Sequence, residues 1–181
     1  MATAKATMVI PLNLTQLSQQ ATMIFHGRVL ANRVKQDPLS RQIVTYTDFQ
    51  IIEAIKGQPG KQYTIKQIGG KLPHSSLAMY VQGVPTFTVG KEYVVFLPTP
   101  SKSGFCSPLG LYQGSFAITL VNGKKTVSSR HSATLANSYQ RTSKMARAGT
   151  TISVPLATSP DHPGKAYLSD FINHIRTLNT E

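Results

Sequence analysis

The chain has 181 residues, of which 40% are hydrophobic and 14% are charged, and its formal net charge is +12. A chain of this length and hydrophobicity can bury a core as a single domain, which excludes a disordered protein. The single cysteine, Cys106, excludes an internal disulfide and a multi-cysteine zinc site, and we expect it to be a buried structural thiol.

The first predicted element is a short helix over residues 14–20. Asn13 can cap its N-terminus, and Gln16, three residues later, can complete a capping box. Leu12 can contact Leu17 across the first turn as a hydrophobic staple. These signals are local in the sequence, so they predict the start of the helix directly.

A series of strands follows the helix. The clearest is Ile43–Gly57, in which apolar or β-branched residues alternate with more polar ones, as in a half-buried strand. Further strands are predicted over 22–31, 63–68 and 86–89, with irregular chain over 71–85. Short strands separated by turn residues predict an all-β barrel or sandwich.

The second half of the chain continues this pattern. Tyr93–Leu97 is apolar at every position, so both of its faces should be buried, at the centre of a closed or double-layered sheet. Strands over Leu111–Val121 and Lys124–Ser129 flank the pair Asn122-Gly123, which predicts a tight hairpin because both residues tolerate positive φ. Apolar residues at helical spacing predict an amphipathic helix over 168–179 that docks on the sheet.

These elements predict one domain over residues 1–181, with three parts. A barrel core with its N-terminal helix covers 12–130, a mobile basic loop covers 131–160, and a segment with the C-terminal helix covers 161–181. The predicted fold class is therefore all-β with minor α.

Four segments resemble a group of uncharacterised exported bacterial proteins: Ala21–Val29, Thr45–Gly57, Val89–Leu97 and Gly110–Phe116. The resemblance implies export. More distantly, the layout is similar to the netrin-like module and to the inhibitory domain of tissue inhibitors of metalloproteinases. That similarity implies a closed or partly open antiparallel OB-like β-barrel with added helices. Those inhibitors present an N-terminal cysteine to the catalytic zinc and are braced by disulfides, which this chain lacks, so their mechanism does not carry over.

Basic residues are the main candidates for a binding site. Between Ala54 and Pro160 the chain has twelve Lys or Arg and one acid, Glu92. We predict a partner surface on the hairpin tip and the loop after it, formed by basic side chains with no carboxylate to neutralise them: Lys124, Lys125, Arg130, Arg141, Lys144 and Arg147. The alternative is that this charge only keeps an exported domain in solution.

Single-stranded nucleic acid is an alternative partner, because an OB-like barrel can stack bases on aromatic side chains. The candidate aromatic residues are Tyr46, Tyr63, Tyr80 and Tyr112.

An enzyme has less support. The five histidines form no metal-binding pair, and His74 next to Ser75 rarely reaches the geometry of nucleophilic attack. Asp48 and Glu53 should lie on opposite faces of their strand. We predict no catalytic residue, metal or cofactor.

The resulting prediction is a non-enzymatic exported binding or assembly module that contacts a protein or an anionic envelope polymer in the periplasm or outside the cell. The alternatives are an OB-like protein for single-stranded nucleic acid and a hydrolase or protease inhibitor. The N-terminal residues have no apolar stretch of leader length, so export requires that Met1 stands where a leader was removed. No membrane span is predicted, and no oligomeric state follows from the sequence.

Overall fold

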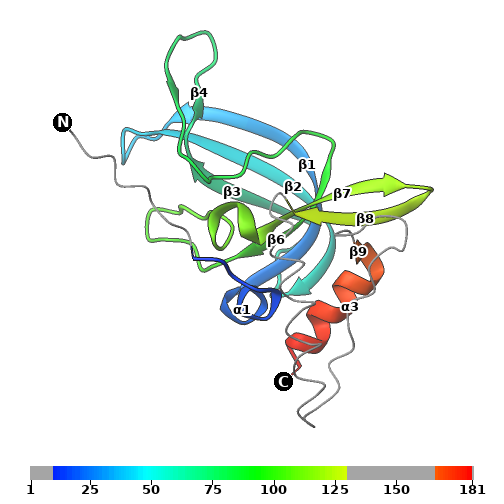
Figure 1. The fold of residues 1–181 in the computed structure, drawn as a ribbon. Coiled ribbons are helices and arrows are strands. Elements are labelled where there is room, and N and C mark those ends of the chain that lie inside the picture. The colour runs from blue at the N-terminus through cyan, green and yellow to red at the C-terminus, as the bar shows by residue number, and fades with distance from the viewer. Residues whose placement is uncertain (1–9, 130–165, 181) are drawn as a thin grey trace, which may run out of the picture.

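The computed structural model describes residues 10–129 and 166–180, and its main feature is an antiparallel sheet with a helix near each end of the chain (Figure 1). Seven strands follow the order β3-β2-β1-β6-β7-β8-β9, and a separate hairpin pairs β4 with β5. In chain order the elements are α1 (Leu14–Gln20), β1 (Met23–Gln36), β2 (Ile43–Lys56), β3 (Gln62–Ile68), β4 (Gly70–Lys71), β5 (Ala78–Met79), β6 (Glu92–Leu97), the 3-10 helix η1 (Leu111–Gly114), β7 (Ser115–Val121), β8 (Lys124–Ser129), β9 (Ala166–Tyr167) and α3 (Leu168–Leu178).

The prediction of a mainly β, antiparallel fold with a helix at each end is confirmed. The described strands do not pair β3 with β9 at the far edge, so a closed barrel is not confirmed. The C-terminal helix lies within one residue of its predicted end. The predicted loop over 131–160 lies outside the described residues.

The predicted capping box at the start of α1 is confirmed. The Gln16 amide N–H donates to Asn13 Oδ1 at 2.8 Å, and the Asn13 amide N–H donates to Gln16 Oε1 at 3.0 Å. These bonds satisfy donors that a helix start leaves without a partner. Leu12 packs against the apolar cluster that contains Leu17, in agreement with the predicted staple.

The two longest strands form a hairpin that runs further than the sequence predicted. β1 pairs with β2 until Gln36 lies opposite Ile43, five residues beyond its predicted end. The turn closes because Asp37 accepts hydrogen bonds from both the amide and the hydroxyl of Ser40, at 3.0 and 2.8 Å. Cross-strand pairing therefore sustains a polar stretch that lacks a strong strand pattern of its own.

The prediction that both faces of Tyr93–Leu97 are buried is confirmed. Val94 and Phe96 belong to the cluster under the two helices, whereas Tyr93, Val95 and Leu97 belong to a second cluster. Alternate side chains of a strand point to opposite faces, so β6 supports both halves of the core.

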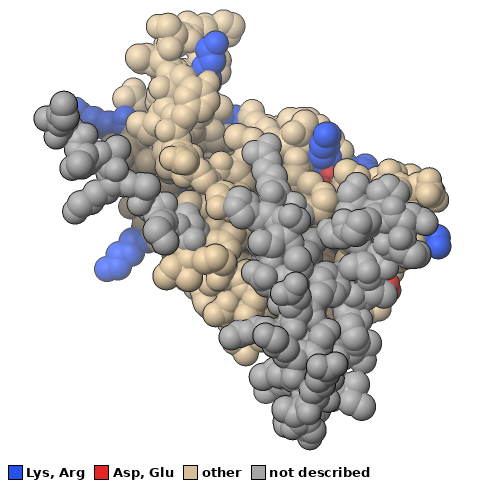
Figure 2. All heavy atoms as spheres, in the orientation of Figure 1, with Lys and Arg blue, Asp and Glu red and all other residues tan. Residues whose placement is uncertain are grey.

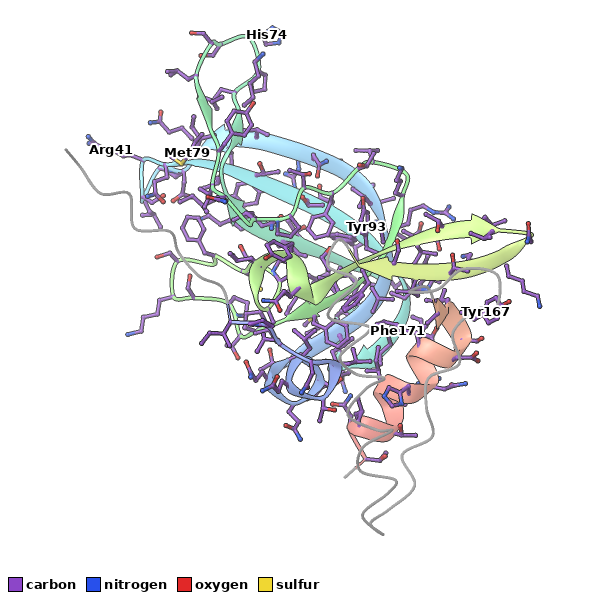
Figure 3. All side chains as sticks on the ribbon, viewed as in Figure 1. Arg41, His74, Met79, Tyr93, Tyr167 and Phe171 are labelled. Carbon is purple, nitrogen blue, oxygen red and sulfur yellow. The ribbon has the colours of Figure 1, made fainter. Side chains whose placement is uncertain are left out.

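The helix-side cluster fixes α3 on the sheet. The Phe171 ring lies 4.9 Å from the Phe116 ring and 6.5 Å from the Phe96 ring, measured between centroids. Figure 3 shows Phe171 pointing from α3 toward the sheet. Figure 1 shows that α1 and α3 lie on the same side of the sheet.

The second cluster lies on the other face and is rich in aromatic rings. Phe49, Phe87 and Tyr93 form successive edge-to-face contacts at 5.0 Å. Cys106 is buried in the same cluster, as predicted, and burial raises its pKa to about 11. Its thiol is therefore protonated and unreactive near neutral pH.

Two strand predictions are wrong. Residues 86–89 are not a strand, because side chains of the sheet bind their backbone: the Asn32 amide donates to the Phe87 carbonyl at 2.7 Å, and Tyr93 Oη accepts from the Thr88 amide at 3.1 Å. The strand predicted from Leu111 begins only at Ser115, after η1. The Asn122-Gly123 turn is confirmed, with φ values of 50° and 74°.

No helix in the described parts of the chain has the length and apolar character needed to cross a membrane.

Candidate functional site

Of the six predicted binding residues, the structure describes only Lys124 and Lys125. The other four, Arg130, Arg141, Lys144 and Arg147, lie outside the described residues. Lys124 Nζ lies 5.2 Å from the centroid of the Tyr167 ring, and Lys125 Nζ lies 2.7 Å from Glu92 Oε2. The prediction that no carboxylate neutralises this segment is therefore wrong for Lys125. The pair is 33 residues apart in sequence, so only the folded sheet reveals it.

Glu92 is the centre of a charged network. His26 Nε2 lies 2.9 Å from Oε2, and the Arg28 guanidinium donates to Oε1 at 2.7 Å. Burial alone would raise the pKa of Glu92, but hydrogen bonds from Lys125, Arg28 and His26 outweigh it and lower the pKa to about 2. An ionised carboxylate only accepts hydrogen bonds, so His26 must donate from Nε2. His26 is buried on β1, so its hydrogen bond to Glu92 is a structural contact within the sheet.

A cleft of about 610 Å³ opens between this network and the start of α3, lined among others by His26, Lys124, Lys125 and Asp170. Its charges nearly balance. Its lining holds two cations, Lys124 and Lys125, and two carboxylates, Glu53 and Asp170. Lys125 is also bound by Glu92 at 2.7 Å, and Glu53 by Arg176 at 2.6 Å. The cleft is therefore a weaker anion site than the sequence indicated.

Basic residues elsewhere also have structural partners. Lys66 Nζ lies 2.7 Å from Asp37 Oδ1 and donates to the Ser103 carbonyl at 2.9 Å. Hydrogen bonds from Lys66 and Ser40 lower the pKa of Asp37 to about 2. Lys66 joins β3 to two loops, so the charge count of the sequence overstated the basic surface that a partner can reach.

The four candidate stacking tyrosines do not share one surface. Lys35 Nζ lies 4.7 Å from the centroid of the Tyr46 ring, and Tyr63 packs on Phe25 with ring centroids 5.9 Å apart. Tyr80 lies beyond β5, and Tyr112 lies in η1. Strand alternation places Tyr46 and Tyr63 on opposite faces, because Tyr63 pairs with Phe49.

Three exposed apolar side chains lie on the β4–β5 hairpin and just after it. Tyr80 is 84% exposed and Leu77 is 62% exposed, and Val81 is also exposed. We call these three residues the hairpin surface. Figure 3 places His74 at the outer end of this hairpin and Met79 at its base. Exposed apolar side chains this close together in the chain mark a candidate contact surface.

The hairpin is firmly seated on the end of the long β1–β2 hairpin. The Gly69 amide donates to the Ile43 carbonyl at 2.8 Å, and the Thr45 hydroxyl donates to the Gly69 carbonyl at 2.7 Å. Gly70, at φ 135°, lies so close to Val34 that a Cβ atom on this glycine would be 2.7 Å from Val34 Cγ1. The hairpin surface therefore projects from a defined base.

A pocket of about 240 Å³, which we call the hairpin pocket, lies beside this base. Its apolar walls come from Val34, Ile68, Met79, Val81 and Phe87. Polar groups of Asn32, Thr45 and Thr47 also line it. Apolar walls with a few placed polar groups are typical of a site that takes up a side chain or a small ligand.

Two cations lie near the base of this hairpin. Lys71 lies on β4, and Arg41 lies two residues before Ile43, which accepts the hydrogen bond from Gly69. Both are exposed and form no ion pair with a carboxylate of the described residues. We call them the basic rim. In Figure 2 the projection at the top is mostly uncharged, with blue atoms near its outer end.

The sequence predicts residues 71–85 as irregular chain and does not reveal this surface. One feature of the sequence could have indicated the hairpin surface. Pro73, Gly83 and Pro85 are typical of a loop, which is usually polar, yet the same segment contains the apolar residues Leu77, Tyr80 and Val81.

Comparisons with models of protein families, with curated proteins and with solved structures find no match to this chain. Within residues 10–129 and 166–180, no three His, Cys, Asp or Glu side chains are grouped so that they could hold a metal ion.

Proposed function

We propose that this protein is a non-enzymatic, exported binding or assembly module that contacts another protein through the hairpin surface. The observation that carries the proposal is Tyr80, which is 84% exposed beside exposed Leu77 and Val81 on a well-anchored hairpin. Tyrosine is enriched among residues that dominate binding energy, since it buries a large area at a low cost in conformational entropy.

Export, and a place in the periplasm or outside the cell, rest on the resemblance of the strand motifs to exported bacterial proteins. The same proposal includes an OB-like, partly open barrel related to the netrin-like module. The order β3-β2-β1-β6-β7 with helices on one face is compatible with it. A fold relationship of this kind supports no specific activity.

The other partners have less support. An anionic envelope polymer would use the predicted basic surface, but Lys125 is already bound to Glu92. Single-stranded nucleic acid would need a shared platform of aromatic rings, and Tyr63 is instead packed on Phe25.

Photo-crosslinking tests the proposed function. A photoreactive amino acid would replace Tyr80 in one variant and Leu120, which is 68% exposed at the end of β7, in a matched control. Both would be irradiated with the envelope fraction of the source cells. We expect a defined protein adduct at position 80 that excess wild-type protein prevents and excess Tyr80→Ser does not. Equal adducts at both positions, or none at position 80, would contradict the proposal.

A further inference from the structure

We propose that the segment bound at the hairpin surface is an acidic polypeptide that inserts one large apolar side chain into the hairpin pocket. This inference rests on the proposed function and defines the chemistry of its partner. It is carried by exposed apolar side chains, an adjoining pocket and two cations near the base of the hairpin, which are contributed by elements that lie far apart in the sequence.

The large apolar side chain of the proposed segment is inferred from the pocket. Its volume of about 240 Å³ is open beside Tyr80 and Val81, which line it and are both exposed. Half-buried Val34 and buried Phe87 are among its lining residues. A protruding side chain that enters such a pocket loses its contact with water while Tyr80 covers it, which is the usual arrangement of a dominant contact in an interface.

The acidic residues of the proposed segment are inferred from the charges near the base of the hairpin. The carboxylates at this end of the sheet are already bound, Asp37 by Lys66 and Asp48 by Arg33. Arg41 and Lys71 therefore lack a counter-charge among the described residues. An acidic residue on each side of the inserted apolar side chain would supply it, and would be attracted at long range by the net charge of +12.

A second copy of the chain is a poorer occupant. A symmetric contact through the hairpin surface would bring Arg41 and Lys71 of one copy toward the same residues of the other. Like charges brought together in an interface are destabilising, so the same features that favour an acidic segment oppose self-association.

Selection from a random peptide library displayed on phage tests the proposal and requires no identified partner. The full-length wild-type protein would be the target, and Tyr80→Ser would remove peptides that bind elsewhere. We expect the selected peptides to contain one large apolar residue flanked by Asp or Glu. Basic or uncharged peptides, or no enrichment over the empty support, would overturn the proposal.

Synthetic versions of the selected peptides would then be measured by fluorescence anisotropy. We expect Tyr80→Ser to weaken binding at least about tenfold. The double variant Arg41→Gln/Lys71→Gln should weaken it about threefold to tenfold at low salt, and less at high salt. Lys61→Gln/Lys91→Gln removes the same charge from exposed positions away from the hairpin and should change affinity less than about twofold. Equal losses in the two double variants would overturn the role of the basic rim.

Two further measurements complete the test. All substituted side chains are exposed, so thermal unfolding should be unchanged, and the variants remain interpretable. Concentration-dependent dimerisation of the wild type that Tyr80→Ser abolishes would show a second copy as the occupant and overturn the proposal. If position 80 crosslinks to a protein but the selected peptides are not acidic, the acidic-segment inference fails while the protein-binding function stands.

Discussion

Replacement of Glu92 by Gln should destabilise the protein because it removes the charge that holds three side chains together. Glu92 accepts from Lys125 and Arg28, each at 2.7 Å, and from His26 at 2.9 Å. Gln keeps the size of the side chain but cannot form the ion pairs. The network links β1, β6 and β8, so its loss should be felt in global unfolding.

The magnitude follows from the pKa of Glu92, which lies at about 2 instead of 4.5. That difference corresponds to about 3 kcal/mol of stability. Because the Lys125 and Arg28 side chains are 41% and 50% exposed, solvent weakens their contribution, and we expect a loss of about 2 kcal/mol.

The pH dependence has a definite sign. A carboxylate with a lowered pKa stabilises the fold above its ordinary pKa of 4.5, and this contribution is lost as the pH falls toward about 2. The free energies of unfolding of wild type and Glu92→Gln should therefore differ most at neutral pH and converge as the pH falls from 4.5 toward about 2. Other acids also titrate there, so the difference between the two proteins is the quantity that isolates Glu92.

The assay is urea unfolding followed by circular dichroism at a series of pH values. Asp170→Asn is the matched control, because Asp170 lines the cleft beside this network and forms no ion pair among the described residues. We expect it to cost less than about 1 kcal/mol, mainly through its place in the first turn of α3. A Glu92→Gln loss no larger than this, or one that stays constant between neutral and acidic pH, would refute the reasoning.

Two other predictions concern the two faces of the core. Phe171→Ala should lower the free energy of unfolding by about 3–5 kcal/mol, because the ring is fully buried against Phe116. Leu120→Ala, at an exposed position, is the control and should lower it by less than about 0.5 kcal/mol. Similar losses for the two variants in denaturant titrations would contradict this prediction. Cys106, with its pKa raised to about 11, should react with a thiol reagent only after unfolding, and rapid labelling of the native protein would argue against its burial.

Features encoded by neighbouring residues were predictable from the sequence. The capping box of Asn13 and Gln16 and the turn at Asn122-Gly123 depend on side chains and φ preferences within a few residues, so they form as the local pattern indicates. The unbroken apolar run Tyr93–Leu97 was equally informative, because only burial on both faces satisfies it.

The candidate sites, by contrast, depend on residues that only the folded sheet brings together. The sequence identified Lys125 as a basic residue, but its partner Glu92 lies on another strand, and Lys66 on β3 likewise meets Asp37 in the turn after β1. Residues 86–89 have a strand pattern, yet Asn32 and Tyr93 bind their backbone and prevent strand pairing. The hairpin surface also escaped prediction, because whether an apolar side chain is buried or exposed is decided by which strands and loops cover it. The sequence alone determined the mainly β, antiparallel character of the fold and the local turns and caps, whereas tertiary packing decided which charges are neutralised and which apolar residues stay exposed.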